Sequence, residues 1–252
     1  MGKLTAWLVA AGLLVGGCGR VQPGFSPASG SLRAQADPAA DLREALARAY
    51  GDLKTLAGRV TYHELDPKDS KVKKSVATFK TDKARRWIRG FIEESDKPGS
   101  KNAETLFLND GKITVRVKIG FVPITKTFPL DDPQVTSGRD YRLDQTDFAA
   151  MVDAVLSASA SLKALGPGEL GGRKVELLEV TPAGLPDASY ERVGLDPATF
   201  LPVARVAFLR GAGAGWNGLA TAFLSPEDTM LFSAALSGEK RDVELPPSTW
   251  RF

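Results

Sequence analysis

The chain has 252 residues, with 33 Lys or Arg against 30 Asp or Glu, so its formal net charge is only +3. This is an ordinary globular composition without a basic block, and it argues against nucleic acid as a partner. A single cysteine, Cys18, and a single histidine, His63, are present. They exclude an intramolecular disulfide, a cysteine metal cluster and any multi-histidine metal site.

The first eighteen residues have the pattern of an export signal. Lys3 is followed by an apolar run over residues 4–15, and Gly16-Gly17 then leads into Cys18. A run of 12 residues is well short of the ~20 needed to span a bilayer, so we expect a cleaved signal over residues 1–17. Val-Gly-Gly-Cys resembles the bacterial lipobox, which implies that Cys18 is diacylated and becomes the first residue of a membrane-anchored protein. The alternative is an ordinary secretory signal with an accidental cysteine.

Residues 18–38 should carry the anchor and then act as a flexible tether, because they are rich in Gly, Pro, Ser and Ala and cannot bury much apolar surface. The folded domain is therefore expected over residues 39–252. Gly19 stands where many inner-membrane lipoproteins have Asp, which favours an exported protein on the outer membrane, facing the periplasm.

The first element of the domain is predicted as a helix over residues 41–56, since leucines recur there at three- and four-residue spacing. An interfacial membrane helix is the alternative, but the polar face is mixed in charge, which favours core packing. From Gly58 onwards the periodicity becomes strand-like. Pro123 should place its strand at an edge or a bulge. The strands expected before the second helix cover residues 59–65, 75–81, 85–93, 105–108, 113–118 and 121–128.

A second helix is predicted over residues 145–165, capped by Asp144 or Thr146 and stopped by Gly166-Pro167-Gly168. Parallel strands need crossover helices, and only two helices interrupt the strands, so the sheet should be largely antiparallel. The strands expected after this helix cover residues 173–181, 190–195, 201–209, 219–224 and 230–236, with a glycine-rich loop at 211–218.

This order of elements resembles the LolA/LolB-like fold, and three stretches carry the resemblance. Residues 50–64 (YGDLKTLAGRVTYHE) look like its opening helix and strand, 106–117 (LFLNDGKITVRV) like its central hairpin, and 195–208 (LDPATFLPVARVAF) like its Asp-x-x-Thr-x-x-Pro turn between strands. The resemblance implies an α+β fold: a strongly curved, mostly antiparallel sheet, an unclosed half-barrel, packed over a few helices. It also implies binding of lipid acyl chains or acylated lipoproteins in an apolar hollow, without a cofactor.

Trp87 and Phe91 share one face of their predicted strand, and with Leu106 and Leu108 on a neighbouring strand they are the candidate walls of that hollow. The alternative is that all four are ordinary core residues. The glycine run at 211–215 lacks the Gly-Lys-Ser/Thr of a phosphate-binding loop, and the acidic pairs at 93–94 and 131–132 lack calcium-loop spacing.

No catalytic motif stands out, so we expect a protein that is not an enzyme. The main hypothesis is a membrane-anchored lipoprotein that handles lipid or acylated lipoproteins. The alternative is an envelope interaction or stress-sensing module that binds a protein partner.

Overall fold

The structure is a computed structural model that describes residues 37–211 and 228–252. The predicted signal, Cys18, almost all of the predicted tether, most of the glycine-rich loop and the predicted strand at 219–224 lie outside the described residues. The described residues belong to one compact unit, Ala36–Phe252.

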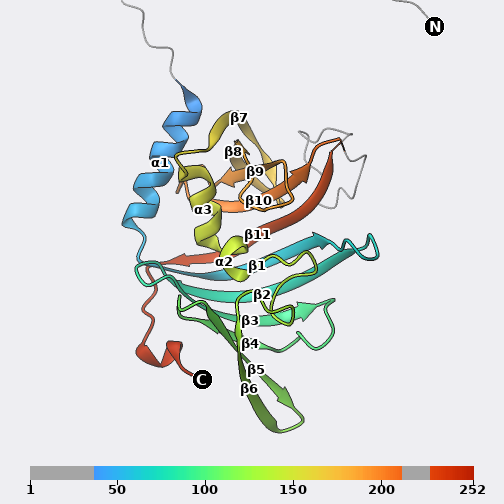
Figure 1. Cartoon of the computed structure of the whole chain (residues 1–252). Coiled ribbons are helices and arrows are strands. Elements are labelled where there is room, and N and C mark those ends of the chain that lie inside the picture. Colours follow the sequence, from blue (N-terminus) through green and yellow to red (C-terminus); the bar gives the residue numbers. More distant parts are fainter. Residues whose placement is uncertain (1–36, 212–227) are drawn as a thin grey trace, which may run out of the picture. The chain divides into compact units, whose positions relative to one another are not determined.

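Eleven strands form one sheet in the order β6-β5-β4-β3-β2-β1-β11-β10-β9-β8-β7, and each neighbouring pair is antiparallel (Figure 1). Strands β6 and β7 are the two edges and do not pair with each other, so the sheet is unclosed. The predicted antiparallel α+β fold is confirmed. The strands are β1 (Thr55–Leu65), β2 (Val72–Asp82), β3 (Trp87–Ser95), β4 (Glu104–Phe107), β5 (Lys112–Ile119), β6 (Val122–Pro129), β7 (Ser161–Leu170), β8 (Arg173–Thr181), β9 (Tyr190–Leu195), β10 (Pro202–Leu209) and β11 (Thr229–Arg241).

Helix α1 (Pro38–Asp52) begins at Asp37, whose side chain accepts hydrogen bonds from the backbone N–H groups of Ala39 and Ala40. The helix ends four residues before the predicted end at residue 56. Leu53 is already extended, and the buried Leu56 belongs to β1. The prediction was wrong here because the three-residue spacing from Leu53 to Leu56 is typical of a helical stripe, although Leu56 lies at the start of a strand.

The second helix is also shorter than predicted. It is split into α2 (Leu143–Thr146) and α3 (Phe148–Leu156), and the predicted helical residues from Ser161 onwards form strand β7. Ser157 and Ser159 bond to each other through their hydroxyls just past the helix end, where such side chains compete with helical hydrogen bonding. Asp147, rather than Asp144 or Thr146, caps α3 by accepting from Ala150 N at 2.7 Å.

The core lies mainly between the helices and one face of the sheet. Helices α1 and α3 contact each other and lie against β7 and β10, respectively (Figure 1). Val152 and Val155 of α3 are fully buried in one cluster with Leu178 and Val193 of the sheet. Leu177, next to Leu178 on β8, points to the opposite face and is also fully buried, in a second cluster. This half of the sheet therefore carries packed apolar side chains on both faces.

The remaining described helix is a short 3-10 helix, η1 (Pro247–Trp250), close to the last residue. Within residues 37–211 and 228–252, no helix has the length and apolar character needed to span a bilayer.

Candidate functional site

The β5–β6 hairpin presents apolar side chains to solvent at the sheet edge farthest from β7. Val117 pairs with Ile124 across the hairpin, so the two side chains share a face. Ile88 lines a small hollow together with Phe148 of α3. It pairs with Phe107, which pairs with Ile113, and Ile113 and Val117 have the same parity on β5, so this is the helix-side face.

Exposure on this hairpin increases towards its turn. Ile113 is buried and Val117 half-buried, whereas Ile124 is 36% and Val122 63% exposed, and Phe121 in the turn is fully exposed. We call Val117, Phe121, Val122 and Ile124 the hairpin surface. A cluster of exposed large apolar residues on one element is typical of a binding surface.

The outer edge of β6 is poorly suited to pairing with another strand. Pro123 and Pro129 are paired with Lys118 and Lys112 of β5 but cannot donate a hydrogen bond to them. The two prolines are six residues apart, so their nitrogens face the same way, towards the open edge. Only Thr125 and Thr127 between them share this orientation. Strand prolines at an edge oppose edge-to-edge association. The position of β6 at the edge of the sheet agrees with the prediction that Pro123 lies at an edge or a bulge.

The candidate groove residues lie on the opposite, outer face. Arg89 pairs with Leu106 and Phe91 with Glu104, so Trp87, Phe91 and Leu106 share this face. Leu106 is buried, Trp87 half-buried and Phe91 39% exposed. The structure thus brings three of the four residues together on the face of the sheet that points away from α1 and α3. Leu108 lies just past the end of β4 and is half-buried. Their role in ligand binding stays a prediction.

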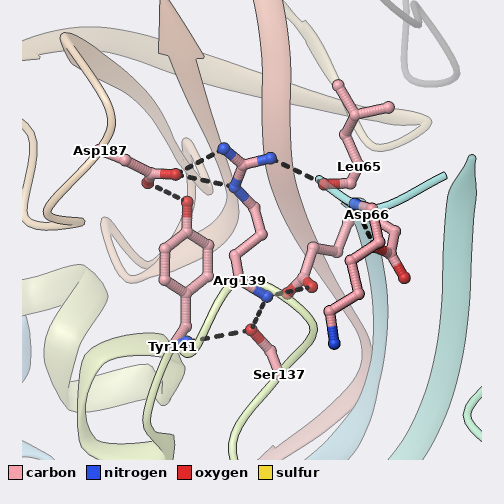
Figure 2. Close-up of polar contacts among 8 residues, drawn as sticks. Leu65, Asp66, Ser137, Arg139, Tyr141 and Asp187 are labelled. Carbon is pink, nitrogen blue, oxygen red and sulfur yellow. Dashed lines mark hydrogen bonds and ion pairs between the residues drawn. The ribbon is translucent and has the colours of Figure 1, made fainter. Parts of the chain in front are cut away.

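The segment between β6 and α2 is held by a polar cluster centred on Arg139 (Figure 2). The Arg139 guanidinium donates to Asp187 Oδ2 through Nε at 2.8 Å and Nη2 at 2.6 Å, and to the carbonyl of Leu65 at 2.8 Å. The hydroxyl of Tyr141 donates to the other oxygen of Asp187. Arg139 therefore connects this segment to the end of β1 and to the loop between β8 and β9.

Glu64 closes the same cluster from β1. Its carboxylate accepts from the backbone N–H of Arg139 at 3.0 Å, and Ser137 Oγ accepts from the N–H groups of Arg139 and Tyr141. Burial raises the pKa of Glu64, while its hydrogen bonds from Ser137 and Arg139 act in the opposite direction. Sequence patterns missed this cluster because most of its members lie in loops, where no periodicity marks them.

A surface cavity of ≈ 350 Å³ lies between α3 and the loop after β8. Its lining includes Arg205, whose buried guanidinium forms a two-point ion pair with Glu191 at 2.6 and 2.7 Å and donates to the carbonyl of Gln145. Glu191 also accepts from the backbone N–H groups of Gly184 and Leu185. The Arg205–Glu191 ion pair connects the two walls of this cavity. The cavity is lined by small and polar side chains, whereas a tunnel for an acyl chain would have an apolar lining.

No group of potential metal ligands suited to holding an ion occurs in the described parts of the chain.

No protein-family model matches the chain, and no curated protein matches its sequence. Solved structures do match, and proteins of the LolA superfamily, whose fold the sequence resembles, are among them. One example is a LolA superfamily protein from Nitrosomonas europaea, which is 10% identical, with a TM-score of 0.39 over 86% of this chain and 99% of that one.

Two further structures have comparable likeness. An uncharacterized conserved protein from Thermus thermophilus is 9% identical, with a TM-score of 0.47 over 85% of this chain and 93% of that one. The lipoprotein LppX of Mycobacterium tuberculosis is 13% identical, with a TM-score of 0.43 over 84% of this chain and 99% of that one. These similarities concern the fold alone and assign no role to any residue.

Proposed function

We propose that this protein is a non-enzymatic lipoprotein of the bacterial envelope, anchored through Cys18, that binds the acyl part of a lipid or of an acylated protein. The observation that carries the proposal is the hairpin surface, where Phe121, Val122 and Ile124 expose large apolar side chains next to one another. The lipobox-like sequence before Cys18 supports the envelope location. It also supports the outer membrane, because Gly19 follows the cysteine.

The free energy gained when this surface is covered is large enough to bind an acyl chain. Fully burying one large aliphatic or aromatic side chain is worth about 1.5–3 kcal/mol, and each methylene of an acyl chain about 0.8 kcal/mol. Three side chains that become covered therefore offer several kcal/mol without any backbone pairing. Lys126 is exposed on the same face of the hairpin as Val122 and Ile124 and can meet an anionic headgroup beside the chain.

The edge of β6 favours side-chain contact over strand addition. A partner strand would need regularly spaced N–H groups along β6, and Pro123 and Pro129 remove two of those that face the open edge. A module that binds a protein partner is the second candidate. It is supported by residues 247–252, a peptide segment that lies on the outer face of β3 and β4.

The test uses the domain with Cys18→Ser, so that the protein's own acyl chains do not compete. Binding of a fluorescent 16-carbon fatty acid is titrated by its emission change. With Phe121→Ser and Ile124→Ser combined, we expect affinity to fall at least tenfold, since the loss of two apolar contacts is worth more than about 1.4 kcal/mol.

Phe91→Ser is the matched control, because Phe91 has an exposure similar to that of Ile124 but lies on the outer face. Unchanged fatty-acid affinity in this variant would assign acyl binding to the hairpin surface, whereas a loss of affinity would assign it to the predicted outer-face residues. Absence of binding by the folded Cys18→Ser protein, or equal binding by the hairpin variant, would refute the proposal.

A further inference from the structure

The outer face of β3 and β4 is covered by the last residues of the described chain. Trp250 of η1 packs edge-on against Trp87, with ring centroids 5.5 Å apart and an interplanar angle of 64°. Thr249 and Trp250 are both buried. On its other side, Trp87 contacts the guanidinium of Arg85, which lies 4.8 Å from the ring centroid. The two tryptophans thus form the centre of a small contact between the sheet and this segment.

Arg89 holds the backbone of the same segment. Its Nη1 donates to the carbonyls of Thr249 and Arg251, each at 2.8 Å, and its Nη2 donates to Glu104 at 2.6 Å. The carboxylate of Glu104 orients the guanidinium, which then binds two main-chain carbonyls at once. Contacts of this kind recognise a peptide backbone whatever its side chains are.

Phe252 completes the contact by lying over two cations of the sheet. Its ring centroid is 5.5 Å from the guanidinium carbon of Arg89 and 5.9 Å from that of Arg116. Arg116 pairs with Glu104 across β4 and β5, so all of these groups share the outer face. The surface therefore recognises two aromatic side chains that are separated by one residue.

The connection to the rest of the domain is short and exposed. Asp242 is fixed to β1, since its N–H donates to the carbonyl of Thr55 at 2.8 Å, and Thr55 Oγ1 donates to the carbonyl of Val243. Glu244, Pro246, Pro247 and Ser248 are exposed. The docked segment therefore depends on its few contacts with the sheet, and its departure would uncover Trp87 and Leu106.

We propose that the outer face of β3–β5 is a docking surface for a short peptide of a protein partner with the chemistry Trp-x-Phe, in which the middle residue is recognised through its backbone carbonyl alone, and that residues 247–252 occupy this surface until such a peptide displaces them. The proposal does not depend on acyl binding, because the hairpin surface lies on the opposite face. Trp87, Arg89 and Arg116 are the residues that recognise the peptide.

A tethered segment competes strongly with a free one. Short flexible linkers give effective concentrations in the millimolar range, so a free peptide should bind well only when the tethered copy is removed. The probe is a fluorescein-labelled peptide of residues 244–252, and its binding is followed by anisotropy. Full-length protein is compared with a variant that ends at Glu244.

We expect the shortened variant to bind the peptide at least tenfold more tightly than the full-length protein, since the tethered competitor is absent. A peptide with Trp250→Ala and Phe252→Ala should bind at least tenfold more weakly. In the shortened variant, Arg89→Lys should weaken binding to a similar degree, because an ammonium lacks the planar fork that reaches both carbonyls and Glu104. Arg48→Lys on the exposed side of α1 is the matched control and should have no effect.

If the shortened variant does not fold, as judged by circular dichroism, full-length protein with Trp250→Ala and Phe252→Ala replaces it, and the same results are expected. The proposal is overturned if the folded variant does not bind the peptide at 1 mM, or if the peptide without its aromatic residues binds equally well.

Discussion

Asp147 combines helix capping with a buried charge. Its carboxylate accepts from Ala150 N at the start of α3 and is almost entirely shielded from water. Burial raises the pKa of Asp147 to about 6, opposed by the hydrogen bond from Ala150 and by the charge of Arg86. An unfolded Asp has a pKa of about 3.9. Between these two values the folded protein binds more protons than the unfolded one, so the stability that this group contributes is present at low pH and is lost as the pH rises from about 4 to about 6.

Asp147→Asn keeps a capping oxygen and removes the buried charge. We expect it to raise the melting temperature at pH 7.5 and to reduce the loss of stability between pH 4 and 6. A pKa difference of about two units sets an upper limit of about 3 kcal/mol for the gain in folding stability at pH 7.5. Up to about 1 kcal/mol of this gain is lost, because Asn lacks the negative charge that interacts favourably with the dipole of α3. Thermal unfolding at pH 4.5 and 7.5 measures both effects.

Asp41→Asn is the control for this prediction, because Asp41 lies in the first turn of α1 but is exposed. A similar gain in that variant, or a lower melting temperature of Asp147→Asn at pH 7.5, would contradict the assignment.

At the scale of elements, the sequence predicted strands better than helix ends. Strands β8 and β9 begin and end at the predicted residues, and the predicted turn between β9 and β10 is present, with Asp196 Oδ1 accepting from the N–H groups of Ala198 and Thr199. Local side-chain chemistry specifies such turns. The long second helix failed because Leu162 fits a helical stripe, whereas in the fold it pairs with Val180 on β8. Pairing with another strand is not visible in the local pattern of one segment, even when that strand follows directly, as β8 follows β7.

The prolines of β6 lead to a prediction at this scale. Replacing Pro123 and Pro129 together by Val restores two N–H groups on the open edge of the sheet. We expect the double variant to self-associate through this edge, which sedimentation velocity would detect as dimers or larger species at concentrations where the parent chain shows none.

Thr125→Val is the control, because it adds an apolar side chain to the same strand without adding an N–H group. Equal self-association of this control would indicate that hydrophobicity, rather than edge pairing, drives the assembly.

At the scale of the whole molecule, the anchor and the binding surfaces belong to different parts of the chain. The anchor is predicted from residues 1–18, and the binding surfaces are built by residues that meet only in the folded sheet. We expect cells that make the natural chain to incorporate radiolabelled palmitate into it and to retain it in the membrane fraction. Cys18→Ser should abolish the label and release the exported domain, since one diacylated cysteine supplies the two chains needed for stable anchoring.

Gly19→Asp keeps the cysteine and is the control for lipidation, so it should still incorporate palmitate. Label that persists in Cys18→Ser would refute attachment at this residue.

The sequence by itself determined the α+β class, the antiparallel sheet and most strands, because alternation and turn chemistry act over a few neighbouring residues. Pro123 restricted its strand to an edge or a bulge, and the tertiary structure places β6 at the edge. The tertiary structure alone decided which face each strand presents to the helices, because alternation separates two faces without saying which of them is covered. Trp87 and Phe91 share one face of β3, as their parity predicted, yet this face is covered by the distant residues 247–252. The exposure of Phe121, Val122 and Ile124 likewise follows from the position of their hairpin at the edge farthest from β7.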